Sequence, residues 1–170
     1  MKKKKGKKIQ LCDIIDNEIK DNSLRNGFPK SFDSHIKQLK TKKIINHKDF
    51  TDIPFVTIDG QDSKDFDDAV WSETKKGITN IMIAISDVSF FIEKNDPLDL
   101  EAKKRGNSFY FPDRVIPMFP NEISNDICSL IPNKERASVV IEIKIKNLKV
   151  ISFKIHRAKI ISVARLTYNE

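Results

Sequence analysis

The feature that most constrains this chain is a run of five aspartates within ten residues. The run lies in the stretch TIDGQDSKDFDDAV, which begins at Thr57. Apolar residues at 55–58 and again from 69 predict that the run connects two strands. Two carboxylates about 4 Å apart in partly hydrated protein repel each other by roughly 4 kcal/mol. A fold that gathers these side chains therefore needs cations to neutralise them.

Two interpretations of the acidic run remain open, a solvated turn and a site for a hard cation. Oxygen ligands without His or Cys select Mg²⁺ or Mn²⁺, and a pair of such ions can support phosphodiester hydrolysis. A calcium loop of the EF-hand type does not fit, because Lys64 stands at the sixth position from Asp59, where glycine is required. No GxSxG motif points to a serine nucleophile.

Net charge gives only weak support to a nucleic-acid partner. The 170 residues carry a formal charge of +7, but six lysines lie in the first eight residues, and without them 25 basic residues face 24 acidic ones. Residues 1–8 are therefore expected to form a basic disordered tail, with a loose phosphate-binding arm as the alternative.

Cysteine usage and hydropathy argue for a cytoplasmic protein without a membrane partner. Cys12 and Cys128 lie far apart and form no CxxC pair, and the three histidines are scattered, so neither a zinc site nor a disulfide framework is expected. No apolar stretch long enough for a signal peptide or a membrane span follows the basic start.

Hydrophobic periodicity predicts an α+β fold, a mixed and mainly antiparallel sheet with flanking helices. Helices are expected at 9–19, after Ser31 as N-cap, at 98–105 and near 121–128. Strands are expected at 55–58, 69–72, 78–85, 138–146 and 150–162, with another element beginning at 164–170. Residues 9–48 thus form a helical connector, and residues 49–170 form the sheet-bearing domain.

Several sequence blocks together resemble the RNB catalytic domain of the ribonuclease II/R family. In chain order they are PFVTIDG (54–60), DFDDAV (65–70), ISDVS (85–89), RGNSFYFP (105–112), VIPMFP (115–120), ISN (123–125) with CSL (128–130), and ARLTYN (164–169). They match the N-terminal portion of that domain almost continuously over residues 49–170. Residues 9–45 resemble, more weakly, the helical stretch that precedes it.

The resemblance implies a processive, Mg²⁺-dependent exoribonuclease. The family hydrolyses single-stranded RNA from its 3′ end to nucleoside 5′-monophosphates. Its catalytic, metal-binding aspartates match Asp59, Asp65, Asp67 and Asp68, whereas Asp62 falls at a variable position. Adjacent residues of a regular strand point to opposite faces, so the chain must turn just before β-structure resumes at 69. We expect Phe66 to be buried as the anchor of that turn.

Two tyrosines match RNA-binding positions of the family. The aromatic residue that stacks on the last nucleotide falls on Tyr110, and an active-site tyrosine falls on Tyr168. Phe109 and Phe111, which flank Tyr110, are expected to pack in the core.

The match also implies what this chain does not contain. Cold-shock domains, an S1 domain and the rest of the RNB domain, which carries an arginine and a glutamate of the site, have no counterpart here. We therefore expect this chain alone to be inactive, with single-stranded RNA and a separately encoded remainder of the enzyme as partners. The alternatives are a non-catalytic RNA-binding or regulatory remnant and a simple Mg²⁺- or Ca²⁺-binding module.

Overall fold

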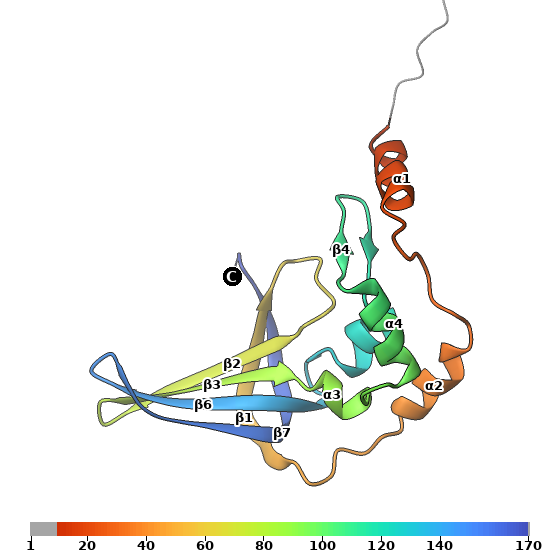
Figure 1. Cartoon of the computed structure of the whole chain (residues 1–170). Coiled ribbons are helices and arrows are strands. Elements are labelled where there is room, and N and C mark those ends of the chain that lie inside the picture. The colour runs from red at the N-terminus through yellow and green to blue at the C-terminus, as the bar shows by residue number, and fades with distance from the viewer. Residues whose placement is uncertain (1–9, 170) are drawn as a thin grey trace, which may run out of the picture.

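The computed structural model describes residues 10–169, so the basic tail predicted at residues 1–8 lies outside the described part (Figure 1). Its elements are, in chain order, α1 (Leu11–Asp21), α2 (Phe32–Leu39), β1 (Lys48–Asp59), β2 (Asp68–Lys75), β3 (Ile78–Ser86), α3 (Val88–Phe91), α4 (Pro97–Arg105), β4 (Phe109–Tyr110), β5 (Val115–Ile116), the π-helix η1 (Ile123–Ile127), β6 (Glu135–Lys146) and β7 (Lys149–Thr167). None of the helices within residues 10–169 is long and apolar enough to cross a membrane.

Five strands close into a barrel in the order β1-β2-β3-β6-β7. All neighbouring strands are antiparallel except β1 and β7, which pair in parallel and close the barrel. The predicted α+β class with a mixed, mainly antiparallel sheet is confirmed. The expectation of a new element at 164–170 is wrong, because β7 continues to Thr167 as those residues pair with the end of β1.

Apolar residues form two separate cores. One fills the barrel and includes Phe55, Met82 and Val140. The other lies where α2 packs against α3, α4 and η1, and it includes Ile36 and Leu98. The connector is therefore attached to the rest of the chain through the apolar face of α2.

The start of α2 differs in detail from the expectation. Ser31 has helical backbone angles, and its side chain makes no capping hydrogen bond. The carbonyl oxygen of Pro29 instead accepts from the Phe32 amide at 3.0 Å. A helix-like turn before α2 thus replaces the predicted side-chain cap.

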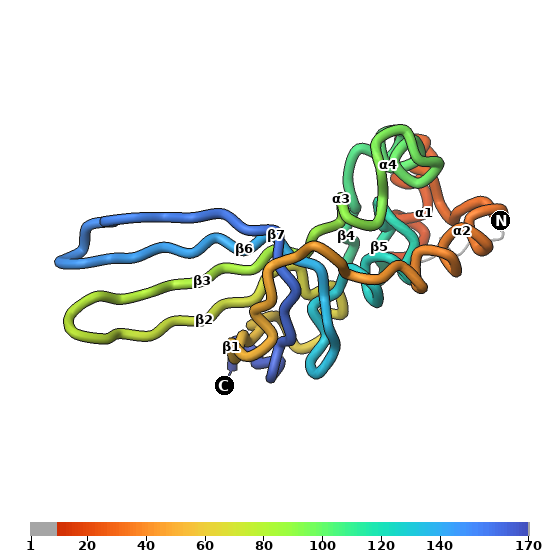
Figure 2. Tube along the Cα trace, turned by 90° about the horizontal axis from the view of Figure 1, so that it is seen from below, coloured from red at the N-terminus to blue at the C-terminus, as the bar shows by residue number. Residues whose placement is uncertain are grey.

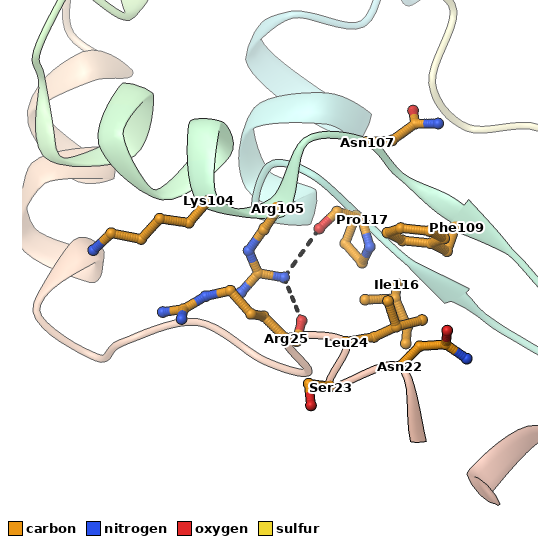
Figure 3. A pocket seen from close by; sticks show the side chains of 10 residues that line it. All are labelled: Asn22, Ser23, Leu24, Arg25, Lys104, Arg105, Asn107, Phe109, Ile116 and Pro117. Atoms are coloured by element: carbon orange, nitrogen blue, oxygen red, sulfur yellow. Dashed lines mark hydrogen bonds between the residues drawn. The ribbon is translucent and has the colours of Figure 1, made fainter. Parts of the chain in front are cut away.

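The buried guanidinium of Arg105 braces the connector against the base of the β4–β5 hairpin. It donates to the carbonyl oxygen of Arg25 in the connector and to that of Pro117 after β5 at 3.2 Å (Figure 3). It also donates to the carbonyl oxygen of Gly27 in the connector. It also pairs with Glu101 at 3.1 Å, and its side chain is only 3% exposed. The guanidinium of Arg105 therefore donates hydrogen bonds to backbone carbonyl groups of two segments that lie far apart in the sequence.

Arg105→Ala should lower the free energy of unfolding by about 3 kcal/mol or more, because it leaves the buried Glu101 carboxylate and three backbone carbonyl groups without this partner. Chemical denaturation measures the change. Arg25→Ala is the matched control, since the Arg25 side chain is 47% exposed although it also pairs with Glu101. It should cost less than about 1 kcal/mol. Equal losses in the two variants would contradict the assignment of Arg105 as the brace.

Candidate active site

The acidic loop, residues 59–68, begins and ends at the same end of the barrel. Asp59 is the last residue of β1 and lies opposite Thr167 of β7. Asp68 is the first residue of β2 and lies opposite Ile85 of β3. The loop leaves one barrel strand and returns to the neighbouring one, so the barrel itself sets where the two end carboxylates lie.

Buried contacts hold the loop in its bent path. Phe66 is 7% exposed, as expected for the anchor of the turn. Its amide donates to the Ser129 hydroxyl at 3.0 Å, and that hydroxyl donates to the Lys64 carbonyl at 2.8 Å. The Leu130 amide donates to the Phe66 carbonyl at 2.9 Å. The segment after η1 therefore fixes the turn that directs the adjacent aspartates.

Four aspartates form one electrostatically coupled cluster. Burial, followed by the charges of Asp68 and Asp65, raises the pKa of Asp59. Burial, followed by the charges of Asp65, Asp68 and Asp59, also raises the pKa of Asp67. Asp59 and Asp67 thus each feel the negative charge of the neighbouring aspartates, and a positive charge, that of Arg165, offsets it only at Asp59.

One carboxylate oxygen of the cluster is left without a partner. Asp59 Oδ2 is buried and has no hydrogen-bond partner among residues 10–169. The positive charge of Arg165 offsets only part of the rise, so the pKa of Asp59 stays above its usual value. The Arg165 guanidinium itself donates to the carbonyl of Gly60 at 2.8 Å and to that of Gln61. Arg165 therefore supports the loop backbone and leaves this Asp59 oxygen free to accept from another group.

Tyr110 reaches the cluster from the β4–β5 hairpin. Its hydroxyl donates to Asp65 Oδ2 at 3.0 Å, although the residue is 68% exposed. Burial and the bond to Asp65 raise the pKa of Tyr110, so the hydroxyl stays protonated at neutral pH. The ring therefore presents an open aromatic surface beside the carboxylates.

The remaining predicted residues lie at the edge of this arrangement. Tyr168 is 76% exposed and directly follows the strand residue opposite Asp59. Asp62 contributes to neither of the two raised pKa values in the cluster. It lines a cavity of about 160 Å³ together with Asp65, Tyr110 and Asn125. Residues of the acidic loop and of η1 both line this cavity.

Ser129 and Arg165 support the site, and sequence reasoning gave neither of them a role. Ser129 is fully buried between Cys128 and Leu130, where a hydroxyl needs a partner. Arg165 interrupts an otherwise largely apolar strand end. At both Ser129 and Arg165, a polar residue within an apolar segment was the sequence signal that could have indicated a supporting role.

The cluster fits a hard divalent cation in ligand type and charge, but it is not a complete metal shell. No three His, Cys, Asp or Glu side chains within residues 10–169 are arranged to hold a metal by themselves. Mg²⁺ commonly keeps several waters and is held by one or two carboxylates together with substrate phosphates. The partnerless oxygen of Asp59 and the unbalanced charge are consistent with that incomplete kind of site.

Asp59→Asn should stabilise the protein at pH 7 in the presence of a chelator, because it removes a charge that burial and the neighbouring carboxylates disfavour. A raised carboxyl pKa stabilises the fold below the unfolded pKa, and this contribution is lost as the pH rises through the folded pKa. The advantage of the variant should therefore shrink toward pH 4. Thermal unfolding at several pH values checks this, and Asp62→Asn, outside the cluster, should change little.

Comparisons with known proteins place the chain in a family. The RNB domain model matches residues 47–170. Ribonuclease R of Buchnera aphidicola subsp. Schizaphis graminum is 46% identical over 140 residues, which are 76% of this chain and 19% of that protein. Ribonuclease R of Escherichia coli is 45% identical over 124 residues, 72% of this chain and 15% of that protein. The chain thus spans less than a fifth of these relatives.

A solved structure agrees with the sequence comparison. Mycoplasma genitalium RNase R, in complex with ribose methylated single-stranded RNA, superposes with a TM-score of 0.87 at 33% identity. The match covers 93% of this chain and 26% of that one. The acidic loop and the strands that hold it lie within the matched family region, and the chain belongs to the RNB domain family.

Proposed function

We propose that this chain supplies the acidic part of the active site of a Mg²⁺-dependent exoribonuclease. In this proposal the complete enzyme degrades single-stranded RNA processively from the 3′ end to nucleoside 5′-monophosphates. The observation that carries it is the coupled cluster of four aspartates, with the exposed Tyr110 hydrogen-bonded to one of them. Membership of the RNB domain family supports the same chemistry.

The residues of the chain have distinct roles in this proposal. Asp59, Asp65, Asp67 and Asp68 would hold Mg²⁺, or Mn²⁺ as the alternative, together with a phosphate of the substrate. The bound ion supplies activation of water and stabilisation of the leaving oxygen. Tyr110 stacks on the terminal base, while its hydroxyl orients Asp65. Tyr168, which directly follows β7 beside the end of β1, contacts the RNA from the β7 side of the site.

We further propose that the chain acts in the cytoplasm together with a separately encoded remainder of the enzyme. Hydrolysis requires the 3′ end to be held in position as well as the metal, and the described carboxylates alone do not form a metal shell. A non-catalytic RNA-binding or regulatory remnant is the alternative. That alternative predicts RNA binding without release of product.

The chain alone should release no labelled nucleoside monophosphate from single-stranded RNA above the level of Asp68→Asn. Co-expression with the remaining portion of an RNB relative should give Mg²⁺-dependent release. Asp68→Asn should reduce this release by about a hundredfold or more, because it removes metal-based stabilisation worth several kcal/mol. Asp62→Asn is the matched control and should retain activity. RNA binding by the assembly without any release would favour the non-catalytic alternative.

Binding of single-stranded RNA by the chain alone should be weak and should depend on its first residues. Removal of residues 2–8 takes away six lysines, so the salt dependence of binding should become shallower, by about 0.7 in log–log slope for each phosphate that the lysines no longer neutralise. Fluorescence anisotropy at several salt concentrations measures this slope. An unchanged slope would instead indicate a binding groove in the body of the chain.

A further inference from the structure

A cavity of about 180 Å³ lies between the connector, the end of α4 and the β4–β5 hairpin (Figure 3). Three of the ten residues that line it are basic, and none is acidic. We call it the basic cavity, and its walls include Arg25, Lys104, Arg105, Phe109, Ile116 and Pro117. Figure 2 shows β4 and β5 close to α1 and α4, at the end of the molecule away from the tips of the barrel hairpins.

The β4–β5 hairpin separates the basic cavity from the acidic cluster. Phe109 pairs with Ile116, and Tyr110 pairs with Val115. Because successive residues of a strand point to opposite faces, the two pairs lie on opposite faces of the hairpin. Phe109 and Ile116 line the basic cavity, whereas Tyr110 and Val115 line the cavity that also contains Asp65. A ligand in the basic cavity would therefore not occupy the acidic cluster.

One wall of the basic cavity is apolar and contains an aromatic ring. Ile116 is buried, and Phe109 is half-buried. Phe109 belongs to neither of the two cores of the described residues, rather than packing in the core as predicted, and its ring instead lines the cavity. An engineered cavity of about 150 Å³ in another protein accommodates benzene. The basic cavity therefore has room for one six-membered ring.

The opposite wall offers cationic groups that can hold an anion. Arg105 is already bonded to backbone carbonyl groups and to Glu101. Arg25 binds Glu101 through Nε and Nη2. Within residues 10–169, neither Arg25 Nη1 nor the Lys104 ammonium has a hydrogen-bond partner. Figure 3 shows the charged ends of Arg25 and Lys104 extending toward the same side of the view, away from Phe109.

Helix electrostatics explain only part of this arrangement. Lys104 lies in the last turn of α4, where a cation interacts favourably with the helix dipole. That interaction accounts for the position of the lysine, but its ammonium donors stay open. It also does not account for an aromatic ring that lines the same cavity without packing in a core. Together these features suit a planar ring that carries an anionic group.

We propose that the basic cavity binds a pyrimidine nucleoside 5′-monophosphate. The single ring of the base packs against Phe109 and Ile116. The phosphate, which carries roughly two negative charges at pH 7, accepts hydrogen bonds from Lys104 and Arg25. This class of nucleotide is the product of the proposed function, so the inference rests on that function for the source of its ligand.

Nuclear magnetic resonance titration of the full chain with uridine 5′-monophosphate (UMP), in the presence of a chelator, tests the site. UMP should shift the backbone amide signals of Lys104, Phe109 and Ile116 and leave those of Asp59 and Asp68 unchanged. Lys104→Gln should weaken the binding about tenfold, as expected for the loss of a hydrogen bond to a charged group. Signal shifts confined to the acidic loop would overturn the proposal.

The matched control is Lys103→Gln. Lys103 lies in the same turn of α4, but it pairs with Asp99 at 2.6 Å and does not line the basic cavity. This variant should leave the affinity for UMP unchanged, and thermal unfolding should show that both lysine variants are folded. Equal affinities of the two variants would contradict the assignment of Lys104 as a phosphate ligand and overturn the proposal.

Three further ligands test the chemistry that the cavity selects. Uridine lacks the phosphate, inorganic phosphate lacks the ring, and adenosine 5′-monophosphate has a base of two fused rings. Each should bind more weakly than UMP, because each loses one of the two contacts or exceeds the space for a single ring. Equal affinity for UMP and for any one of them would overturn the proposal.

A short oligouridylate distinguishes a free nucleotide from a nucleotide within RNA. Its internal phosphates carry only one charge each. At the same concentration of nucleotide it should therefore shift the signals of Lys104 and Phe109 less than UMP does. Larger shifts than those of UMP would overturn the assignment of a free nucleotide and indicate a contact with RNA.

The two proposals can fail separately, because binding of UMP is measured without metal or turnover. A chain that binds UMP in the basic cavity, but whose assembly never hydrolyses RNA, would refute the proposed exoribonuclease and retain this site. An active assembly whose chain does not bind UMP would support the exoribonuclease and refute the site.

Discussion

Repulsion among four carboxylates is the constraint on which the rest of the site depends. The charges of Asp65 and Asp68 help to raise the pKa values of Asp59 and Asp67, and the fold must hold the four side chains together against that repulsion. The barrel does this by placing the two ends of the loop on neighbouring strands. Hydrogen bonds from the segment after η1 and from the end of β7 then hold the backbone between them. Holding the carboxylates together lowers the stability of the fold, and the negative charge that results favours the binding of a cation.

Much of the fold could be predicted because its signals are local. Alternating apolar residues identified parts of all five barrel strands but not the short strands β4 and β5, and the acidic run between two barrel strands identified the candidate site. The burial of Phe66 also followed from local geometry, since adjacent aspartates can serve one site only if the backbone turns beside them. Ser31 directly precedes α2, as predicted, but its side chain makes no capping hydrogen bond, and the Pro29 carbonyl in the preceding turn accepts from the Phe32 amide instead.

Closure of the barrel could not be predicted in the same way. It depends on the parallel pairing of β1 with β7, and nothing in the sequence near either strand specifies a partner about a hundred residues away. The supporting roles of Ser129 and Arg165 were missed for the same reason, because each contacts the acidic loop across more than sixty residues.

The β1–β7 pairing also has a consequence for the order of folding. Contacts between distant parts of a chain form slowly, because the intervening segment must first be closed into a loop. During synthesis β1 emerges long before β7, and until β7 is available the acidic loop lacks both Arg165 and one wall of the barrel. The aspartates can then remain apart and hydrated. The charged cluster is therefore assembled as a late event, when most of the compensating structure already exists.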